Sequence, residues 1–344
     1  MTTQFHRFRR PLAASAAAAM LVLGLVAAAL GTSSAARADT PVSCNTPVTS
    51  APSGPATVSV ASTAYGNVLV LGGSGPKAGC SLYVLTSDAV HALGRPAFAC
   101  ANAPVPQLGN PAPTCANALW PALLTKGAPI AGPGVNPSLL GTTSRGLVIS
   151  GTSVEQVTYR GQPLYFFFQD EQPGETEGAD LFDNVVDPTG IWYLVDPSRG
   201  IPAPGTAQLQ LETFAGATAK QQTVLAATMN YRFGAFPDAR FPVYTYSKDS
   251  GGTSACTGEC ALNWPPLLTS EQPQVIGYAV DPGALGTIVR PDGTRQVTYN
   301  GKPLYLDAKD AYIGTLPKPF DGPGGLNGDG ASVGGGTFSA IPLP

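Results

Sequence analysis

Short segments in which hydrophobic and polar residues alternate recur along the chain. Residues 57–62 (Thr-Val-Ser-Val-Ala-Ser) alternate, and short apolar runs follow at residues 67–71 and 82–85. Segments rich in glycine and proline separate these runs. Alternation with a period of two predicts half-buried β-strands, and no segment after residue 38 shows the 3.6-residue period of a long amphipathic helix. The pattern therefore predicts an all-β protein that is rich in hairpins and in Gly/Pro loops.

Two matched segments predict hairpins of the same design. Residues 156–165 read Gln-Val-Thr-Tyr-Arg-Gly-Gln-Pro-Leu-Tyr, and residues 296–305 read Gln-Val-Thr-Tyr-Asn-Gly-Lys-Pro-Leu-Tyr. Asn-Gly between two strands is the strongest short signal for a two-residue hairpin turn, and Arg-Gly takes the same place in the first segment. The proline that follows begins the returning strand, where a missing N–H is tolerated.

Further matched blocks indicate that one unit occurs twice. Residues 140–145 match residues 285–290 at an offset of 145, and the hairpin segments match at an offset of 140. One small length change between matched blocks indicates duplication. We therefore predict two tandem homologous domains of small β-sheet or β-sandwich type, at residues 55–200 and 223–344, with a linker at residues 201–222. Residues 57–62 and 223–230 are the expected first strands of these domains.

The N-terminus has the features of a targeting segment. A basic region with Arg9 and Arg10 precedes an apolar run over residues 12–30, and Ala36-Arg37-Ala38 fits a signal-peptidase site. We predict a cleaved signal peptide at residues 1–38 and an extended segment at residues 39–54, with no stable membrane insertion after cleavage. An uncleaved anchor is the alternative, because the run is nearly long enough to span a bilayer. The general secretory and the twin-arginine routes both stay open.

Composition and charge narrow the range of partners. Charged residues make up 12% of the chain, which contains 41 glycines and 34 prolines, as is typical of a loop-rich secreted β protein. Without residues 1–38 the chain has 15 basic and 22 acidic side chains, a net charge of −7. A mildly acidic chain without a basic run argues against nucleic acid and anionic membranes as partners.

Six cysteines follow the predicted signal peptide. An even number of cysteines in an exported chain indicates disulfide bonds. The pair in the second half can close a small loop, a pair in the first half takes the matching place, and the remaining two tie the N-terminus to the first domain. The predicted bridges are Cys256–Cys260, Cys100–Cys115 and Cys44–Cys80. A redox or metal-binding pair is the alternative for the close pair, although no histidine lies near it in the sequence.

A tyrosine and an aspartate five residues apart recur in both halves. Residues 244–249 read Tyr-Thr-Tyr-Ser-Lys-Asp and are followed by Cys-Thr-Gly-Glu-Cys and Trp-Pro-Pro-Leu, whereas residues 165–170 read Tyr-Phe-Phe-Phe-Gln-Asp. These residues resemble the bacterial secreted repeat of unknown function, which has a Tyr-x-aromatic-x-x-Asp motif. Two further copies depart from the motif, with Leu85 and Asp307 at the second aromatic position. The resemblance implies an exported β-rich module and no established activity.

Repeated tyrosine, tryptophan, arginine and aspartate residues are candidates for ligand binding, because both halves contain them. The aspartates follow strands, where Asp commonly caps a turn, and a glycosidase pair is the catalytic alternative. The aromatic residues are expected in the core, with a sugar-binding face as the alternative, and Tyr299 and Tyr305 are expected to face each other across their hairpin. The arginines are expected to form ion pairs with the aspartates, or else to bind an anion. The candidates are Tyr83, Asp88, Trp120, Arg145, Tyr159, Tyr165 and Asp170, followed by Tyr244, Tyr246, Asp249, Trp264, Arg290, Tyr299, Tyr305 and Asp310.

Histidine is scarce after the signal peptide. Only His91 remains, and it lies outside both repeated segments, so a surface position is expected rather than a catalytic triad. The same scarcity argues against a transition-metal centre, and no metal and no cofactor is predicted. The acidic loops after Asp170 and Asp310 are expected to be solvated, with a calcium site as the alternative.

These observations lead us to expect an exported, non-enzymatic repeat protein of the cell envelope. It would bind or organise an unknown envelope component or a small molecule. A carboxylate-based enzyme that acts on envelope glycans and a thiol/disulfide redox module are the alternatives. The oligomeric state does not follow from the sequence.

Overall fold

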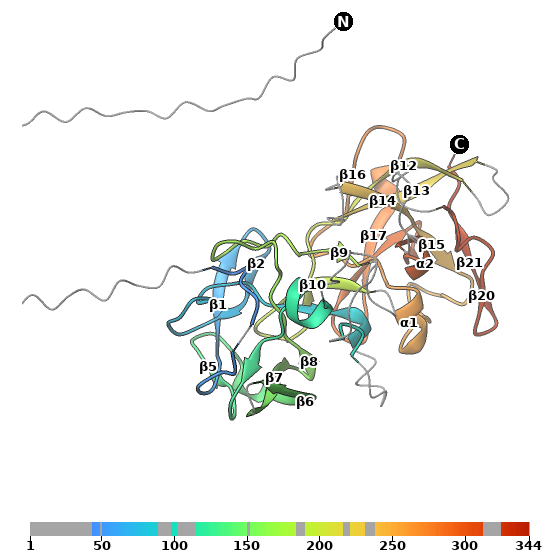
Figure 1. Cartoon of the computed structure of the whole chain (residues 1–344). Helices are drawn as coiled ribbons and strands as arrows, with labels where there is room; N and C mark the ends of the chain where they lie inside the picture. The colour runs from blue at the N-terminus through green and yellow to red at the C-terminus, as the bar shows by residue number, and fades with distance from the viewer. Residues whose placement is uncertain are drawn as a thin grey trace, which may run out of the picture. The chain divides into compact units, whose positions relative to one another are not determined.

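The computed structural model describes residues 43–48, 50–88, 98–101, 114–149, 152–183, 190–215, 221–230, 238–311 and 325–343, all within one compact unit, Thr40–Pro344 (Figure 1). The predicted signal peptide and His91 lie outside the described residues. Strands dominate, and the α-helices of the described part are the short α1 (Glu259–Asn263) and α2 (Ala308–Ala311). This confirms the predicted all-β class.

The described strands of the first half contribute to three sheets. A β1–β2 hairpin has β5 parallel to β1, while β10 pairs with β3, β9 and β11, and β7 pairs with β4, β6 and β8. The strands are β1 (Thr57–Thr63), β2 (Gly66–Leu71), β3 (Tyr83–Leu85), β4 (Leu124–Thr125), β5 (Ile130–Ala131), β6 (Leu140–Ile149), β7 (Thr152–Tyr159), β8 (Gln162–Pro163), β9 (Leu181–Phe182), β10 (Ile191–Val195) and β11 (Pro202–Ala203).

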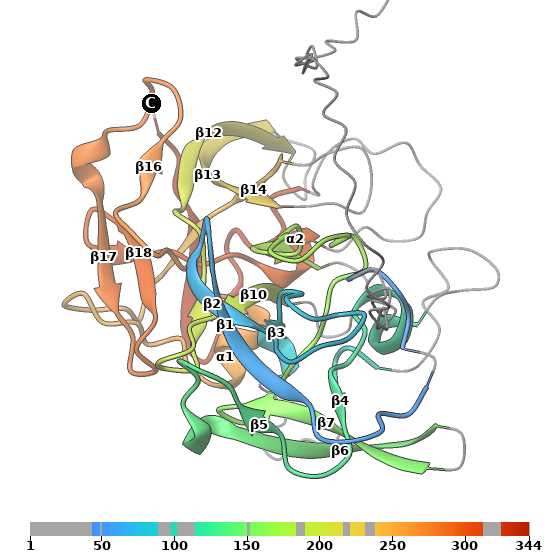
Figure 2. The ribbon, with the colours of Figure 1, turned by 90° about the vertical axis from the view of Figure 1, so that its left-hand side faces the viewer.

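The second half repeats most of these pairings. A β12–β13 hairpin has β16 parallel to β12, β15 pairs with β21, and β18 pairs with β17 and β19. Figure 2 shows the β6–β7 and β17–β18 ladders as separate antiparallel pairs. The strands are β12 (Gln208–Ala215), β13 (Gln221–Asn230), β14 (Asp238–Pro242), β15 (Tyr244–Tyr246), β16 (Gln274–Val275), β17 (Leu285–Val289), β18 (Arg295–Tyr299), β19 (Lys302–Pro303), β20 (Ser332–Val333) and β21 (Gly336–Ala340).

Both predicted hairpin turns are present. Arg160 and Gly161 have φ angles of 50° and 78°, and Asn300 and Gly301 have φ angles of 48° and 74°. Two successive residues with positive φ define the turn that matches the twist of the flanking strands. The turn residues therefore set the register of β7–β8 and β18–β19.

The first strand of the second half is β12, which lies within the segment predicted to be a linker. The backbone N–H of Ile130 donates to the Ala56 carbonyl (2.8 Å), and that of Gln274 donates to the Ala207 carbonyl in the same way (2.9 Å). These bonds place β12 in the position of β1, and residues 223–230, in β13, in the position of β2. The predicted match of residues 223–230 with residues 57–62 is therefore wrong. The division into two tandem homologous domains stays a prediction.

One hydrophobic cluster contains side chains from both halves. It includes Val58, Leu69 and Leu164 of the first half together with Leu209 and Leu304 of the second. The sheet that contains β9 and β10 also contains β12 and β13, because Leu181 pairs with Asn230. Two smaller clusters lie around Trp120 and Trp264, one in each half. The three disulfide bonds have the predicted partners: Cys44–Cys80, Cys100–Cys115 and Cys256–Cys260.

Candidate functional site

A buried tryptophan anchors the matched cluster in each half. Trp120 follows the helical turn Cys115–Leu119, and its ring stacks on Trp192 with centroids 3.7 Å apart. Trp264 follows α1, and its ring stacks on Phe338 with centroids 3.6 Å apart. Both tryptophans are at most 4% exposed, which confirms the expected core position.

Tyrosines and aspartates of the first half bond across the two motif copies. Tyr83 and Tyr165 form an antiparallel bridge. The Tyr83 hydroxyl donates to Oδ2 of Asp170 (2.7 Å), and the Tyr165 hydroxyl donates to Oδ2 of Asp88 (2.5 Å). Each tyrosine thus bonds the aspartate of the other copy, and we call each such pair a Tyr–Asp brace.

The second half contains the same two braces. Tyr244 and Tyr305 form an antiparallel bridge. The Tyr244 hydroxyl donates to Oδ2 of Asp310 (2.6 Å), and the Tyr305 hydroxyl donates to Oδ1 of Asp249 (3.1 Å). The five-residue spacing of the motif therefore brings two strands and two loops together reciprocally.

The aspartates of the braces also accept backbone hydrogen bonds. Oδ1 of Asp88 accepts from the Ala99 N–H (2.8 Å), and Oδ1 of Asp170 accepts from the Glu177 N–H (2.9 Å). The corresponding bonds of the second half join Ala255 to Asp249 (2.8 Å) and Asn327 to Asp310 (3.0 Å). The aspartates therefore accept backbone hydrogen bonds, as expected for capping residues. The N–H groups that donate them lie 6 to 17 residues away and not in the adjacent turn.

Arg290 supports one brace indirectly. Its Nη1 donates to Ser254 Oγ (2.7 Å) and to Gln296 Oε1 (2.7 Å), and its Nη2 donates to the Cys256 carbonyl (3.0 Å). Ser254 Oγ in turn lies 2.7 Å from the Tyr305 hydroxyl. The guanidinium therefore ties the brace to the disulfide loop without a direct ion pair to Asp249.

Arg145 has the equivalent role in the first half. Its Nη1 donates to Gln156 Oε1 (2.8 Å) and to the Tyr165 hydroxyl (3.0 Å), and its Nη2 donates to the Cys100 carbonyl. The expected ion pairs between the repeated arginines and aspartates are thus replaced by links through hydroxyl groups. Gln156 and Gln296 belong to the same networks, and sequence reasoning missed them although both stand in the matched hairpin segments.

Burial dominates the electrostatics of the braces. Desolvation raises the pKa of Asp170 to about 7 and that of Asp310 to about 8, against the lowering effect of their tyrosine partners. Desolvation also raises the pKa of Asp88 and of Asp249. The tyrosine hydroxyls are less acidic than free tyrosine for the same reason. Protonated carboxyls thus persist in the folded protein well above their ordinary pH range.

Replacing Tyr244 with phenylalanine is expected to lower the free energy of unfolding by about 1–3 kcal/mol, because Asp310 would lose its hydroxyl donor in a buried site. Urea unfolding followed by circular dichroism measures this effect. Tyr278→Phe is the matched control, since Tyr278 is fully exposed (106%). Equal stability of the two variants would show that the brace does not stabilise the fold.

Thirteen of the fifteen candidate residues are buried, and Arg145 and Asp249 are partly buried. Tyr299 packs in a different cluster from Tyr305, so the two do not face each other across the hairpin. Tyr159 likewise lies in the shared cluster, whereas Tyr246 stacks on Phe338. The acidic loops are not simply solvated, because Asp170, Asp183 and Asp310 are at most 1% exposed.

Two glycines that sequence reasoning missed complete the tryptophan sites. A Cβ atom on Gly178 would lie 2.7 Å from the Trp120 ring, and one on Gly328 would lie 2.7 Å from the Trp264 ring. Both follow the residue whose N–H caps a brace aspartate. Only a residue without a side chain fits at this distance. No repeated spacing points to these glycines in the sequence, because Gly178 lies 8 residues after Asp170 and Gly328 lies 18 residues after Asp310.

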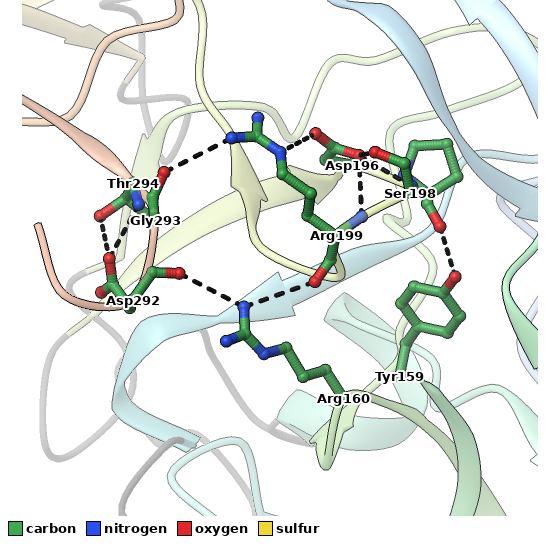
Figure 3. Close-up of polar contacts among 9 residues, drawn as sticks. Tyr159, Arg160, Asp196, Ser198, Arg199, Asp292, Gly293 and Thr294 are labelled. Carbon is green, nitrogen blue, oxygen red and sulfur yellow. Dashed lines mark hydrogen bonds and ion pairs between the residues drawn. The ribbon is translucent and has the colours of Figure 1, made fainter. Parts of the chain in front are cut away.

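Side chains of both halves meet at a junction that is separate from the braces. Arg160 Nη1 donates to the carbonyls of Asp292 (3.3 Å) and Arg199 (3.4 Å), and Arg199 Nη1 donates to the Gly293 carbonyl (3.5 Å) (Figure 3). Arg199 Nε also bonds Asp196 Oδ2 at 2.8 Å. Figure 3 shows these contacts between residues 292–294, which precede β18, and residues 196–199, which follow β10.

Two cavities flank this junction. One has a volume of about 570 Å³ and contains Arg199 and Arg295 in its wall, and the other has a volume of about 440 Å³ and contains Arg160 and Arg290. Both are lined by residues of the two halves, and they have Ile201 in common. Volumes of this size are typical of small-molecule sites.

Metal and membrane features are absent from the part of the chain that the structure describes. Within it, no three His, Cys, Asp or Glu side chains cluster as metal ligands would. No helix among the same residues is long and apolar enough to cross a membrane.

Comparison with known proteins identifies the repeated segments. Residues 152–188, 239–268 and 286–315 match the model of a family described as a secreted repeat of unknown function. They contain the motif copies at residues 165–170, 244–249 and 305–310, whereas the copy at residues 83–88 lies outside the match. No curated protein and no solved structure matches the chain. The resemblance is thus confirmed: three segments of the chain match the secreted repeat of unknown function.

Proposed function

We propose that this chain is a non-enzymatic binding module of the cell envelope, in which the Tyr–Asp braces hold a disulfide-stabilised scaffold. The observation that carries the proposal is the reciprocal bonding of the repeated residues. Every repeated aspartate already accepts one tyrosine hydroxyl and one backbone N–H. Carboxyl groups that already accept a tyrosine hydroxyl and a backbone N–H support a structural role for the motif, and among the four only Oδ2 of Asp249 is buried without a hydrogen-bond partner.

The catalytic alternative has less support. A glycosidase needs two carboxyl groups that reach the same bond of a substrate and admit water. Asp88, Asp170 and Asp310 are each 1% exposed, and only Asp249 is partly accessible. Their hydrogen bonds would have to break before either carboxyl could transfer a proton to a substrate.

The redox alternative also has less support. A thiolate must reach a sulfur atom to exchange with a disulfide. Cys256 is 0% exposed and Cys260 is partly buried, and the Cys256 carbonyl accepts from Arg290. The bond to Cys260 thus belongs to the same network as a brace, which favours a structural disulfide.

Sedimentation with cell-envelope material tests the proposal. Mature protein is mixed with washed envelopes of the producing organism and centrifuged, and both the pelleted protein and the soluble sugars and peptides are measured. We expect the protein to pellet with the envelopes and to release no soluble product. Release that disappears in the Asp249→Asn/Asp310→Asn variant would establish the enzyme instead, and failure to pellet would refute envelope binding.

A further inference from the structure

We propose that the junction between the two halves is a binding groove for an acidic glycan, a sugar chain that carries carboxylate or phosphate groups. The inference rests on the proposed binding function and names the ligand class. The groove is defined as the two cavities of about 570 and 440 Å³ on either side of the contacts in Figure 3.

The two cavities of the groove adjoin each other. They have Ile201, Pro202 and Thr294 in common, so these residues form the wall between them. The contacts that lie between them are single hydrogen bonds of 3.3 to 3.5 Å from Arg160 and Arg199 to backbone carbonyls. Bonds of this length are weak, so a ligand that supplies better acceptors can replace them.

Positive charge is concentrated in the groove. Arg199 and Arg295 line the larger cavity, and Arg160 and Arg290 line the smaller one. With Asp196 and Asp292 the lining has four basic and two acidic side chains, a net charge of +2, in a protein whose net charge is −7 after the signal peptide. An anionic ligand is the partner that such a local reversal of charge favours.

The carboxylates of the groove are already bonded. Asp196 pairs with Arg199 at 2.8 Å, and Oδ1 of Asp292 accepts from the N–H (2.8 Å) and the hydroxyl (2.6 Å) of Thr294. Within the described residues, neither Arg160 nor Arg295 has a carboxylate within ion-pair distance. Each cavity therefore offers one exposed guanidinium without an acidic partner, which suits one carboxylate or phosphate group.

The remaining walls suit a sugar chain. Asn67 and Ser270 give the larger cavity polar groups that can bond hydroxyls, whereas Pro202, Pro266, Leu262 and Leu268 give the smaller cavity an apolar surface. A pyranose has hydroxyls at its edge and C–H groups on its faces, so it can use both kinds of wall. An acidic glycan thus matches the groove in charge and polarity.

Calorimetric titration of the mature protein tests the proposal with three probes. Oligogalacturonate carries carboxylates on its sugars, a phosphorylated mannan oligosaccharide carries phosphates on its sugars, and maltohexaose is the neutral control. We expect binding of at least one acidic probe, weakened by added salt, and no comparable binding of maltohexaose. Whichever acidic probe binds identifies the source of the charge.

The variant Arg160→Asn/Arg295→Gln removes the two unpaired charges. Both side chains are exposed, and asparagine stands at the equivalent turn position 300, so the fold is expected to persist. Binding should weaken by about tenfold or more. Lys302→Gln is the matched control. Lys302 is an exposed cation on the β18–β19 hairpin, which also contains Arg295, and it lies outside both cavities.

The outcomes separate the groove from the proposed function. Failure of both acidic probes to bind, equal binding of maltohexaose, or unchanged binding by the double variant overturns the groove. If the double variant still pellets with envelopes as the native protein does, the binding module stands and the groove is wrong. If the native protein does not pellet, the proposed function itself fails.

Discussion

Replacing Trp264 with alanine is expected to lower the free energy of unfolding by about 3–5 kcal/mol, the usual cost of removing a buried tryptophan. The ring is 4% exposed, stacks on Phe338 at 3.6 Å and meets the edge of Tyr244 at 5.5 Å. The space cannot close easily, because the Cys256–Cys260 disulfide holds the preceding turn and the Pro265 carbonyl accepts from Leu306 (2.8 Å). A rigid surrounding leaves a larger cavity and so a larger cost.

Urea unfolding of the purified protein measures this effect. The control is Val289→Ala, because Val289 is 74% exposed and a surface truncation of this kind changes stability by no more than about 0.5 kcal/mol. If Trp264→Ala lowers the free energy of unfolding by less than about 1 kcal/mol, the surrounding residues collapse into the space of the missing ring and the site is not rigid.

Raising the pH from about 4 to 8 is expected to destabilise the folded protein through the brace aspartates. The pKa values of Asp170 and Asp310 are raised by burial to about 7 and about 8. Below about pH 4 these carboxyls are protonated in both states. Above it the unfolded chain releases protons that the folded chain retains, so unfolding becomes more favourable until the folded carboxyls also ionise, at about pH 8.

The size of this contribution is on the order of 5 kcal/mol for each of the two aspartates, at about 1.4 kcal/mol for each pKa unit that separates the folded and unfolded states. Thermal unfolding across this pH range provides the measurement. Asp170→Asn/Asp310→Asn is the comparison, because asparagine keeps the shape of the carboxyl group and does not titrate. An identical pH dependence of the native and double-variant melting temperatures would contradict the assignment.

Local patterns allowed much of the fold to be predicted. The Asn300-Gly301 turn, the three disulfides and the buried tryptophans all follow from short segments whose chemistry restricts the backbone or demands burial. The start of the second half was missed. Residues 208–215 read Gln-Leu-Gln-Leu-Glu-Thr-Phe-Ala and do alternate. The proline and glycine residues around them favoured the prediction of a linker over that of a strand.

The candidate residues were found, but their partners were not. Spacing within one motif copy gives no information on which aspartate a tyrosine reaches, because that choice depends on the bridge between Tyr83 and Tyr165 and between Tyr244 and Tyr305. The junction was missed for a similar reason. Arg160 and Asp292 are separated by 132 residues, and only the packing of the two halves brings them together.

The reciprocal braces also determine how small a fragment of the gene can be gained or lost without disrupting the fold. Each tyrosine finds its acceptor in the other motif copy, so a gene fragment that encodes a single copy leaves a buried hydroxyl and a carboxyl without partners. Truncation between the copies at residues 244–249 and 305–310 should therefore break both braces of the second half and leave those of the first half intact. Insertions and deletions in the genes of this family should correspondingly gain or lose motif copies in twos.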